Sequence, residues 1–163
     1  MKIFFLRHGD AELGTTGSDS DRRLTSEGVA EIELVARTMQ LLKLNLTGIA
    51  SSPFVRARQT ADIITKKFPS LRPQTFEQLT PTAFPADLFR ELLSFPRDSR
   101  ILLVSHEPFI STCIGQLISG NNEPKISIKK GMLASMEVGS PVQHGAGVLL
   151  WLLPTEHMRL MNA

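Results

Sequence analysis

Residues 100–105 read Arg-Ile-Leu-Leu-Val-Ser, and this short run limits the possible folds more than any other part of the chain. An unbroken apolar run is typical of a strand buried on both faces, as the central strands of parallel sheets are. A second run, Ile3-Phe4-Phe5-Leu6, has the same character. Strand-like and helix-like segments alternate elsewhere. We therefore expect an α/β fold, a three-layer α/β/α sandwich with a mostly parallel central sheet, formed as one domain by residues 1–163.

The remaining elements are expected from periodicity and from helix and turn signals. The first predicted helix begins at Thr25, and its apolar face consists of Val29, Ile32, Val35, Ala36, Met39 and Leu42. The second begins at Ser52–Pro53 and runs to about Lys67. A short helix is expected at about Ala86–Phe95, and a last one from Pro108 to near Gly120. Further strands are expected at 48–51, 74–77, 133–138 and 148–153, the last two antiparallel. A polar loop is expected over residues 14–23.

Composition excludes several classes of function. The net charge of +2 is too small to indicate nucleic acid or an anionic membrane as the main partner, and no apolar run is long enough to cross a bilayer. The apolar run near the N-terminus is too short for a signal peptide, so we expect a cytoplasmic protein. The single Cys113 excludes an internal disulfide and a multi-cysteine metal site, and its apolar surroundings favour a buried, inert thiol. The sequence does not define the oligomeric state.

Both apolar strands run directly into a histidine. The first is followed by Arg7-His8-Gly9 and the later one by Ser105-His106-Glu107. Because ligands of open α/β sheets bind beyond the carboxyl ends of the strands, we expect His8 and His106 at one functional edge. The strand at 48–51 leads to the same edge and places Arg56 in the first turn of a helix, where the amides favour an anion.

These residues predict a positively charged site for a phosphoryl group. The planar fork of arginine suits phosphoryl oxygens, and a neutral imidazole held among cations is able to attack phosphorus. Gly9 would let the backbone approach the ligand. The alternatives are ordinary: a histidine after a strand is often only a hydrogen-bonding residue, and Arg56 and Arg58 are also typical of a solvated helix face. We expect His144 and His157 at the surface, and no spacing indicates a metal site.

Four segments together resemble the histidine phosphatase, or phosphoglycerate mutase-like, superfamily. They are Arg7-His8-Gly9, Leu24-Thr25-Ser26-Glu27-Gly28, the stretch Ser52-Pro53-Phe54-Val55-Arg56-Ala57-Arg58-Gln59-Thr60-Ala61, and Ser105-His106-Glu107-Pro108. The resemblance implies that His8 is the nucleophile that becomes phosphohistidine. It also implies that Arg7, Arg56 and His106 complete the phosphate pocket, and that no metal or cofactor is needed.

Within this superfamily the chain looks most like the small SixA-type protein-phosphohistidine phosphatases. Arg7-His8-Gly9-Asp10-Ala11 and Glu77-Gln78-Leu79-Thr80-Pro81 follow that group's pattern, and the stretch after Leu79 is too short for a large helical lid. The resemblance implies an open site that dephosphorylates a phosphohistidine-containing signalling or phosphocarrier protein. Two alternatives stay open, a phosphatase for small phosphate monoesters and a non-catalytic phosphate-binding module. The general acid is equally open among Glu77, Asp10 and Glu107.

Overall fold

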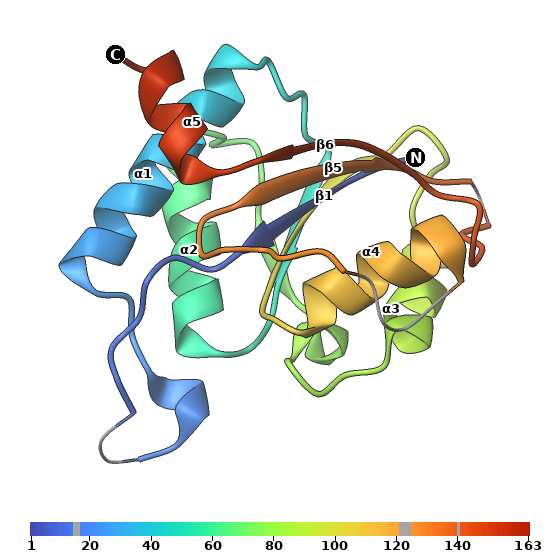
Figure 1. The fold of residues 1–163 in the computed structure, drawn as a ribbon, viewed down its shortest axis with the longest axis horizontal. Coiled ribbons are helices and arrows are strands. Elements are labelled where there is room, and N and C mark those ends of the chain that lie inside the picture. The colour runs from blue at the N-terminus through green and yellow to red at the C-terminus, as the bar shows by residue number, and fades with distance from the viewer. Residues whose placement is uncertain (15–16, 121–124, 140) are drawn as a thin grey trace.

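The computed structural model describes residues 1–14, 17–120, 125–139 and 141–163, and a six-stranded sheet forms its centre (Figure 1). The strands are β1 Lys2–Arg7, β2 Gly48–Ser51, β3 Pro73–Thr75, β4 Arg100–Ser105, β5 Leu133–Glu137 and β6 Val148–Leu153. Their spatial order is β3-β2-β4-β1-β5-β6. The pairings from β3 to β1 are parallel, whereas β5 is antiparallel to both β1 and β6. The sheet is therefore mostly parallel, as the sequence predicted.

Helices cover both faces of this sheet (Figure 1). The helices are α1 Ser26–Leu41, α2 Val55–Thr65, α3 Pro85–Glu91, α4 Phe109–Ser119 and α5 Thr155–Met161, with 3₁₀ turns η1 Asp19–Asp21, η2 Glu77–Leu79 and η3 Leu92–Ser94. Side chains alternate along a strand, so each central strand feeds two cores. Phe5 and Leu103 pack in the core under α3 and α4, while Phe4 and Leu102 pack in the core under α1, α2 and α5. The three-layer sandwich is confirmed.

Several boundaries differ from the prediction. The second helix begins at Val55 because Ser52 to Phe54 form a turn, in which the Ser52 hydroxyl accepts a hydrogen bond from the Phe54 N–H. Val29 and Leu42, at the two ends of the predicted apolar face of α1, are each 37% exposed, so the buried face is narrower. The strand predicted at 74–77 is shorter and lies one residue earlier, as β3 at Pro73–Thr75, because the 3₁₀ turn η2 begins at Glu77.

Two parts of the chain hold structure that was not predicted. The expected polar loop contains η1, while its Thr15 and Thr16 lie outside the described residues. The C-terminal tail forms α5, whose Met158 is fully buried in the core beneath α1 and α2. None of the described helices is long and apolar enough to cross a lipid bilayer.

Two glycines allow the chain after β1 to pack against the first turn of α1. A Cβ on Gly28 would overlap the carbonyl oxygen of Asp10. A Cβ on Gly9 would lie 2.8 Å from both the Gly28 carbonyl oxygen and Cγ1 of Ile32. The structure thus gives a packing reason for Gly9, since α1 fills the space that a side chain would need. Approach of its backbone to a ligand stays a prediction.

Alanine at Gly28 is expected to destabilise the protein by about 3 kcal/mol, because the added methyl group meets backbone atoms that cannot turn away. Urea unfolding followed by circular dichroism measures this change. Alanine at Gly14, where the nearest atom is Cδ of Arg22 at 3.5 Å, is the matched control. Equal unfolding midpoints for the Gly28→Ala variant and the parent chain would refute the packing argument.

Candidate active site

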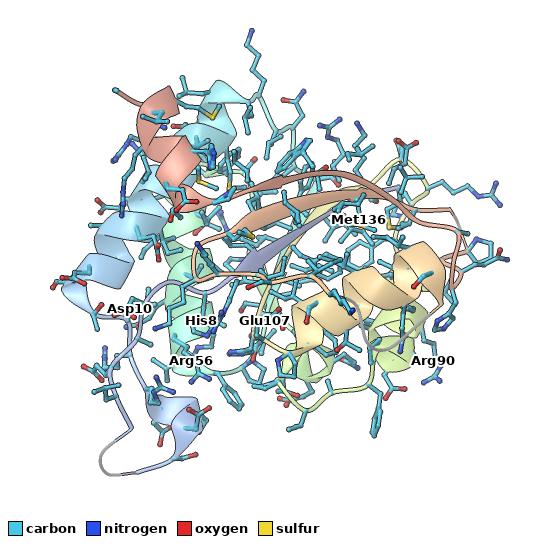
Figure 2. All side chains as sticks on the ribbon, in the orientation of Figure 1. His8, Asp10, Arg56, Arg90, Glu107 and Met136 are labelled. Atoms are coloured by element: carbon cyan, nitrogen blue, oxygen red, sulfur yellow. The ribbon has the colours of Figure 1, made fainter. Side chains whose placement is uncertain are left out.

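The two strand-end histidines lie side by side. In the parallel pairing of β1 with β4, Arg7 is opposite Ser105, so the next residues, His8 and His106, leave the sheet together. The His8 N–H donates to the Ser105 carbonyl at 3.1 Å, and the two ring centroids are 4.9 Å apart. Only 6% of His8 and 1% of His106 is exposed. Figure 2 shows His8, Arg56 and Glu107 gathered at this edge of the sheet.

The hydrogen bonds of the His8 ring define its tautomer. Nδ1 lies 2.7 Å from the Gly9 carbonyl oxygen, which only accepts, so Nδ1 carries the proton. Nε2 therefore keeps its lone pair, and this lone pair accepts a hydrogen bond of 3.1 Å from Nε of Arg56. Burial, reinforced by the Arg56, Arg7 and Lys130 charges, lowers the pKa of His8 to about 4. A neutral ring with a free Nε2 lone pair is the form that attacks phosphorus.

The ring of His8 is expected to stay neutral on acidification until the pH approaches about 4. A lowered pKa favours the unprotonated form, so the His8 ring stays mostly neutral through the whole range from pH 5 to 8. Long-range ¹H–¹⁵N correlation spectra of the imidazole rings against pH measure this titration and identify the Nδ1–H tautomer. A His8 ring that is already protonated at pH 6 would contradict the described environment.

Arg56 is held from two sides at the start of α2. Only 4% of Arg56 is exposed, and its guanidinium lies over the Phe54 ring, 5.0 Å from the centroid. Nη1 donates to the Asp19 carbonyl oxygen at 2.5 Å, and Nη2 donates to Asp19 Oδ2 at 2.8 Å. Asp19 also pairs with Arg22 at 2.8 Å, so η1 carries a small ion-pair network over the site. This network directs Nε of Arg56 at the His8 ring.

Arg7 and His106 bring further polar atoms to the site. Nη1 of Arg7 donates to the Ile128 carbonyl at 2.8 Å. Within the described part of the chain, Nε of Arg7 and both ring nitrogens of His106 are buried and have no hydrogen-bond partner. Burial, followed by the charges of its neighbours, lowers the pKa of His106 to about 2. Buried polar atoms are normally satisfied, so these atoms are candidates for contact with a ligand.

The three candidate acids lie in different surroundings. Asp10 pairs with Lys130 Nζ at 2.5 Å and accepts from the Thr25 hydroxyl at 2.8 Å, and these contacts lower its pKa. Glu77 is exposed and lines a groove of about 540 Å³ between η2 and α3. Glu107 is half-buried, burial raises its pKa, and its Oε1 accepts the Ser111 N–H at 3.1 Å. Of the three, Glu107 has the environment that favours a protonated carboxyl group.

The other singled-out residues lie away from this cluster. Arg58, His144 and His157 are exposed, and Cys113 is fully buried with a pKa raised by burial. Among the residues that the structure describes, no three histidine, cysteine, aspartate or glutamate side chains are grouped to hold a metal ion.

Comparison with known proteins identifies the family. The sequence profile of the histidine phosphatase superfamily (branch 1) matches residues 3–84, which include His8 and Arg56. The chain belongs to this superfamily. As a member of the histidine phosphatases, it is a phosphatase that hydrolyses phosphoryl groups, which agrees with the paired histidines and arginines of the site.

Individual relatives extend this likeness over the whole histidine phosphatase chain. It is 27% identical to the phosphohistidine phosphatase SixA of Escherichia coli K12 over 167 residues, covering 100% of this chain and 99% of that one. An uncharacterized protein of a Picosynechococcus strain is 33% identical, with 86% and 87% covered. A solved structure of the protein histidine phosphatase SixA complexed with tungstate superposes with a TM-score of 0.86 at 27% identity, covering 97% and 99%.

Three contributors to this histidine phosphatase site were missed from the sequence. Asp19 anchors Arg56, and Lys130 adds a cation near His8. Thr60 accepts from the Gly9 N–H at 3.3 Å and donates to the Arg56 carbonyl at 2.8 Å, which ties the loop after β1 to α2. Asp19 lies in the three-residue turn η1 and Lys130 in an irregular segment, so neither belongs to a periodic pattern. Thr60 follows Arg56 by one helical turn, and that spacing was a usable signal.

Proposed function

We propose that this phosphatase removes the phosphoryl group from a phosphohistidine side chain of another protein, through a phospho-His8 intermediate. The observation that carries the proposal is the state of His8: Nδ1 bound to the Gly9 carbonyl, and the Nε2 lone pair aimed at Arg56 beside His106. The relatives support the choice of substrate, since the SixA protein of Escherichia coli and its Haemophilus influenzae homologue are named phosphohistidine phosphatases. We also propose that residues 1–163 act as one catalytic domain, because both cores share one sheet.

The segment between β3 and β4 supports a protein substrate. Between these strands the chain forms only η2, α3 and η3, and α3 has seven residues. Such short elements do not enclose a small molecule as a long helical lid would. The absence of a long lid helix between β3 and β4 therefore favours a phosphoryl group that projects from the surface of a protein.

In the first step Nε2 of His8 attacks phosphorus. The bond from phosphorus to the substrate imidazole breaks, and its electron pair stays on that imidazole, which leaves in neutral form once protonated. Nε of Arg56 moves from Nε2 to a phosphoryl oxygen, while Arg7 and neutral His106 donate to the others. The proton for the leaving group fits Glu107 better than Asp10, because the two pKa values are shifted in opposite directions.

In the second step water attacks the phosphorus of phospho-His8. The bond between phosphorus and Nε2 breaks, inorganic phosphate leaves, and the neutral His8 ring is restored. The Gly9 carbonyl keeps the Nδ1 proton in place throughout, so the same nitrogen is used in each turnover. The intermediate is therefore a phosphoramidate, which is stable in alkali and labile in acid.

The test compares phosphate release from a panel of phosphohistidine proteins with release from sugar phosphates at matched concentrations. We expect kcat/KM to be at least about 100-fold higher on one or more phosphohistidine proteins. Rapid alkaline quench with ³²P-labelled phosphoprotein should trap acid-labile label on the enzyme. Faster hydrolysis of sugar phosphates would instead establish a small-molecule phosphatase, and no hydrolysis of any substrate would establish a binding module.

A further inference from the structure

The segment that leads into β5 is fastened to the end of β1, next to the nucleophile (Figure 1). Arg7 donates to the Ile128 carbonyl, and the Gly131 N–H donates to the Arg7 carbonyl at 3.1 Å. Gly131 has φ +66°, and a Cβ there would lie 2.7 Å from Cγ2 of Thr155. Glycine is favoured at this position, because the left-handed φ strains other residues and a Cβ would crowd Thr155. The neighbouring Lys130 is therefore delivered to the active-site edge by the fold itself.

The Lys130 ammonium group is held at this edge by a single carboxylate. Its Nζ lies 2.5 Å from Asp10 Oδ1, while the other oxygen of Asp10 accepts the Thr25 hydroxyl. The side chains of Lys130 and Asp10 are 41% and 36% exposed, so neither is locked into a buried ion pair. Figure 2 shows Asp10 and His8 on the same side of the sheet edge. The Lys130 charge also reaches His8, where it acts in the same direction as Arg56 and Arg7.

We propose that Lys130 is a substrate-binding residue whose ammonium group leaves Asp10 and binds a non-bridging oxygen of the phosphoryl group. Asp10 is then the positioning residue that holds Lys130 beside His8 when no phosphoryl group is bound. This inference rests on the proposed phosphate site at His8, and it does not depend on whether the substrate is a phosphoprotein or a small ester.

Charge explains why the ammonium group changes partner. A phosphoryl group carries up to two negative charges on three oxygens, whereas Asp10 offers one charge that is already shared with the Thr25 hydroxyl. A partly exposed ion pair contributes little free energy, so separating Lys130 from Asp10 costs little. Lysine has a long, flexible stem, which suits a cation that moves between two partners.

Lys129 provides a matched control in the same segment. Its side chain is 69% exposed and its Nζ lies 4.0 Å from Oε2 of Glu156, on α5. Substitution of Lys129 or Lys130 by methionine removes the same charge from the same loop. The two variants therefore separate a specific contact with phosphate from a general change in surface potential.

The experiment measures the dissociation constant of inorganic phosphate, and of tungstate, by calorimetry at fixed ionic strength. We expect Lys130→Met to weaken binding about tenfold and Lys129→Met to change it less than twofold. We expect Asp10→Asn to tighten binding about threefold, because it releases Lys130 and removes a negative charge that repels the ligand. Lys130→Arg should restore most of the affinity.

Lys130→Met and Asp10→Asn are expected to change the phosphate affinity in opposite directions. This difference distinguishes a contact with the ligand from an ion pair that only stabilises the loop. If the Asp10–Lys130 pair only fastened the loop, both Asp10→Asn and Lys130→Met would weaken binding and lower the melting temperature together, and the inference would be overturned. A Lys130→Met variant that binds phosphate with the parental affinity would overturn the inference as well, while leaving the proposed function intact. Parent protein that binds neither anion would remove the proposed function together with this inference.

Discussion

Alanine at His8 is expected to lower kcat by at least about 10⁴-fold on any phosphorylated substrate, because the proposed reaction has no other nucleophile at the phosphorus atom. The ring centroids of His8 and His106 are 4.9 Å apart, and the His106 ring packs beside Phe54. In the proposed reaction His106 donates a hydrogen bond to a phosphoryl oxygen and does not attack phosphorus. The loss should appear in kcat, since the remaining cations still bind phosphate. Phosphoenzyme formation should vanish with it.

Single-turnover kinetics with quench at alkaline pH measure both effects in one experiment. His144→Ala is the matched control, because that histidine is exposed in the loop before β6 and its removal should leave kcat unchanged. Phosphate binding by the His8→Ala variant shows that the site is still folded. Turnover at the parental rate in that variant would disprove the covalent route.

Lysine at Arg56 is expected to lower kcat/KM about 10²- to 10³-fold, although the positive charge is kept. Three nitrogens of the guanidinium are used at once, with Nε on His8 and the two Nη atoms on Asp19. A single ammonium group cannot hold Asp19 and still reach the nucleophile. The loss therefore measures the planar fork of arginine separately from its charge.

Steady-state kinetics of Arg56→Lys and Arg56→Ala against Arg58→Ala provide the measurement. Arg58 is an exposed cation two residues further along α2, and its removal should have little effect. Asp19→Asn should reduce kcat/KM by less than Arg56→Lys, since it keeps the carbonyl contact to Nη1 and loses only the carboxylate charge. An Arg56→Lys variant with parental kcat/KM would show that any cation is sufficient there.

Much of the candidate site could be predicted, because both of its histidines directly follow apolar strands. An apolar run such as Ile101 to Val104 indicates a buried strand, and the residues that follow it lie at the edge of the sheet. The sequence does not contain the order of the strands, however. That β1 and β4 are neighbours, and that His8 therefore meets His106, depends on packing between segments far apart in the chain.

The residues that escaped prediction depend on contacts that no local pattern encodes. Asp19 lies in a loop whose place is defined by Arg56 on α2, and Lys130 lies in a segment fastened to Arg7. Helix α5 has only seven residues, too few to establish a helical period, and it is stabilised by the burial of Met158. In each case the tertiary partner, rather than the segment's own sequence, determines the structure.

The hydrogen bond from Arg56 to the lone pair of His8 also bears on which reagents can modify the resting enzyme. An electrophile without anionic oxygens finds the imidazole nitrogen already engaged and has nothing with which to draw the guanidinium away. An oxyanion brings its own acceptor for that N–H and so uncovers the lone pair as it arrives. We therefore expect the His8 ring of the resting enzyme to react slowly with alkylating and acylating agents, and faster with reagents that carry anionic oxygens.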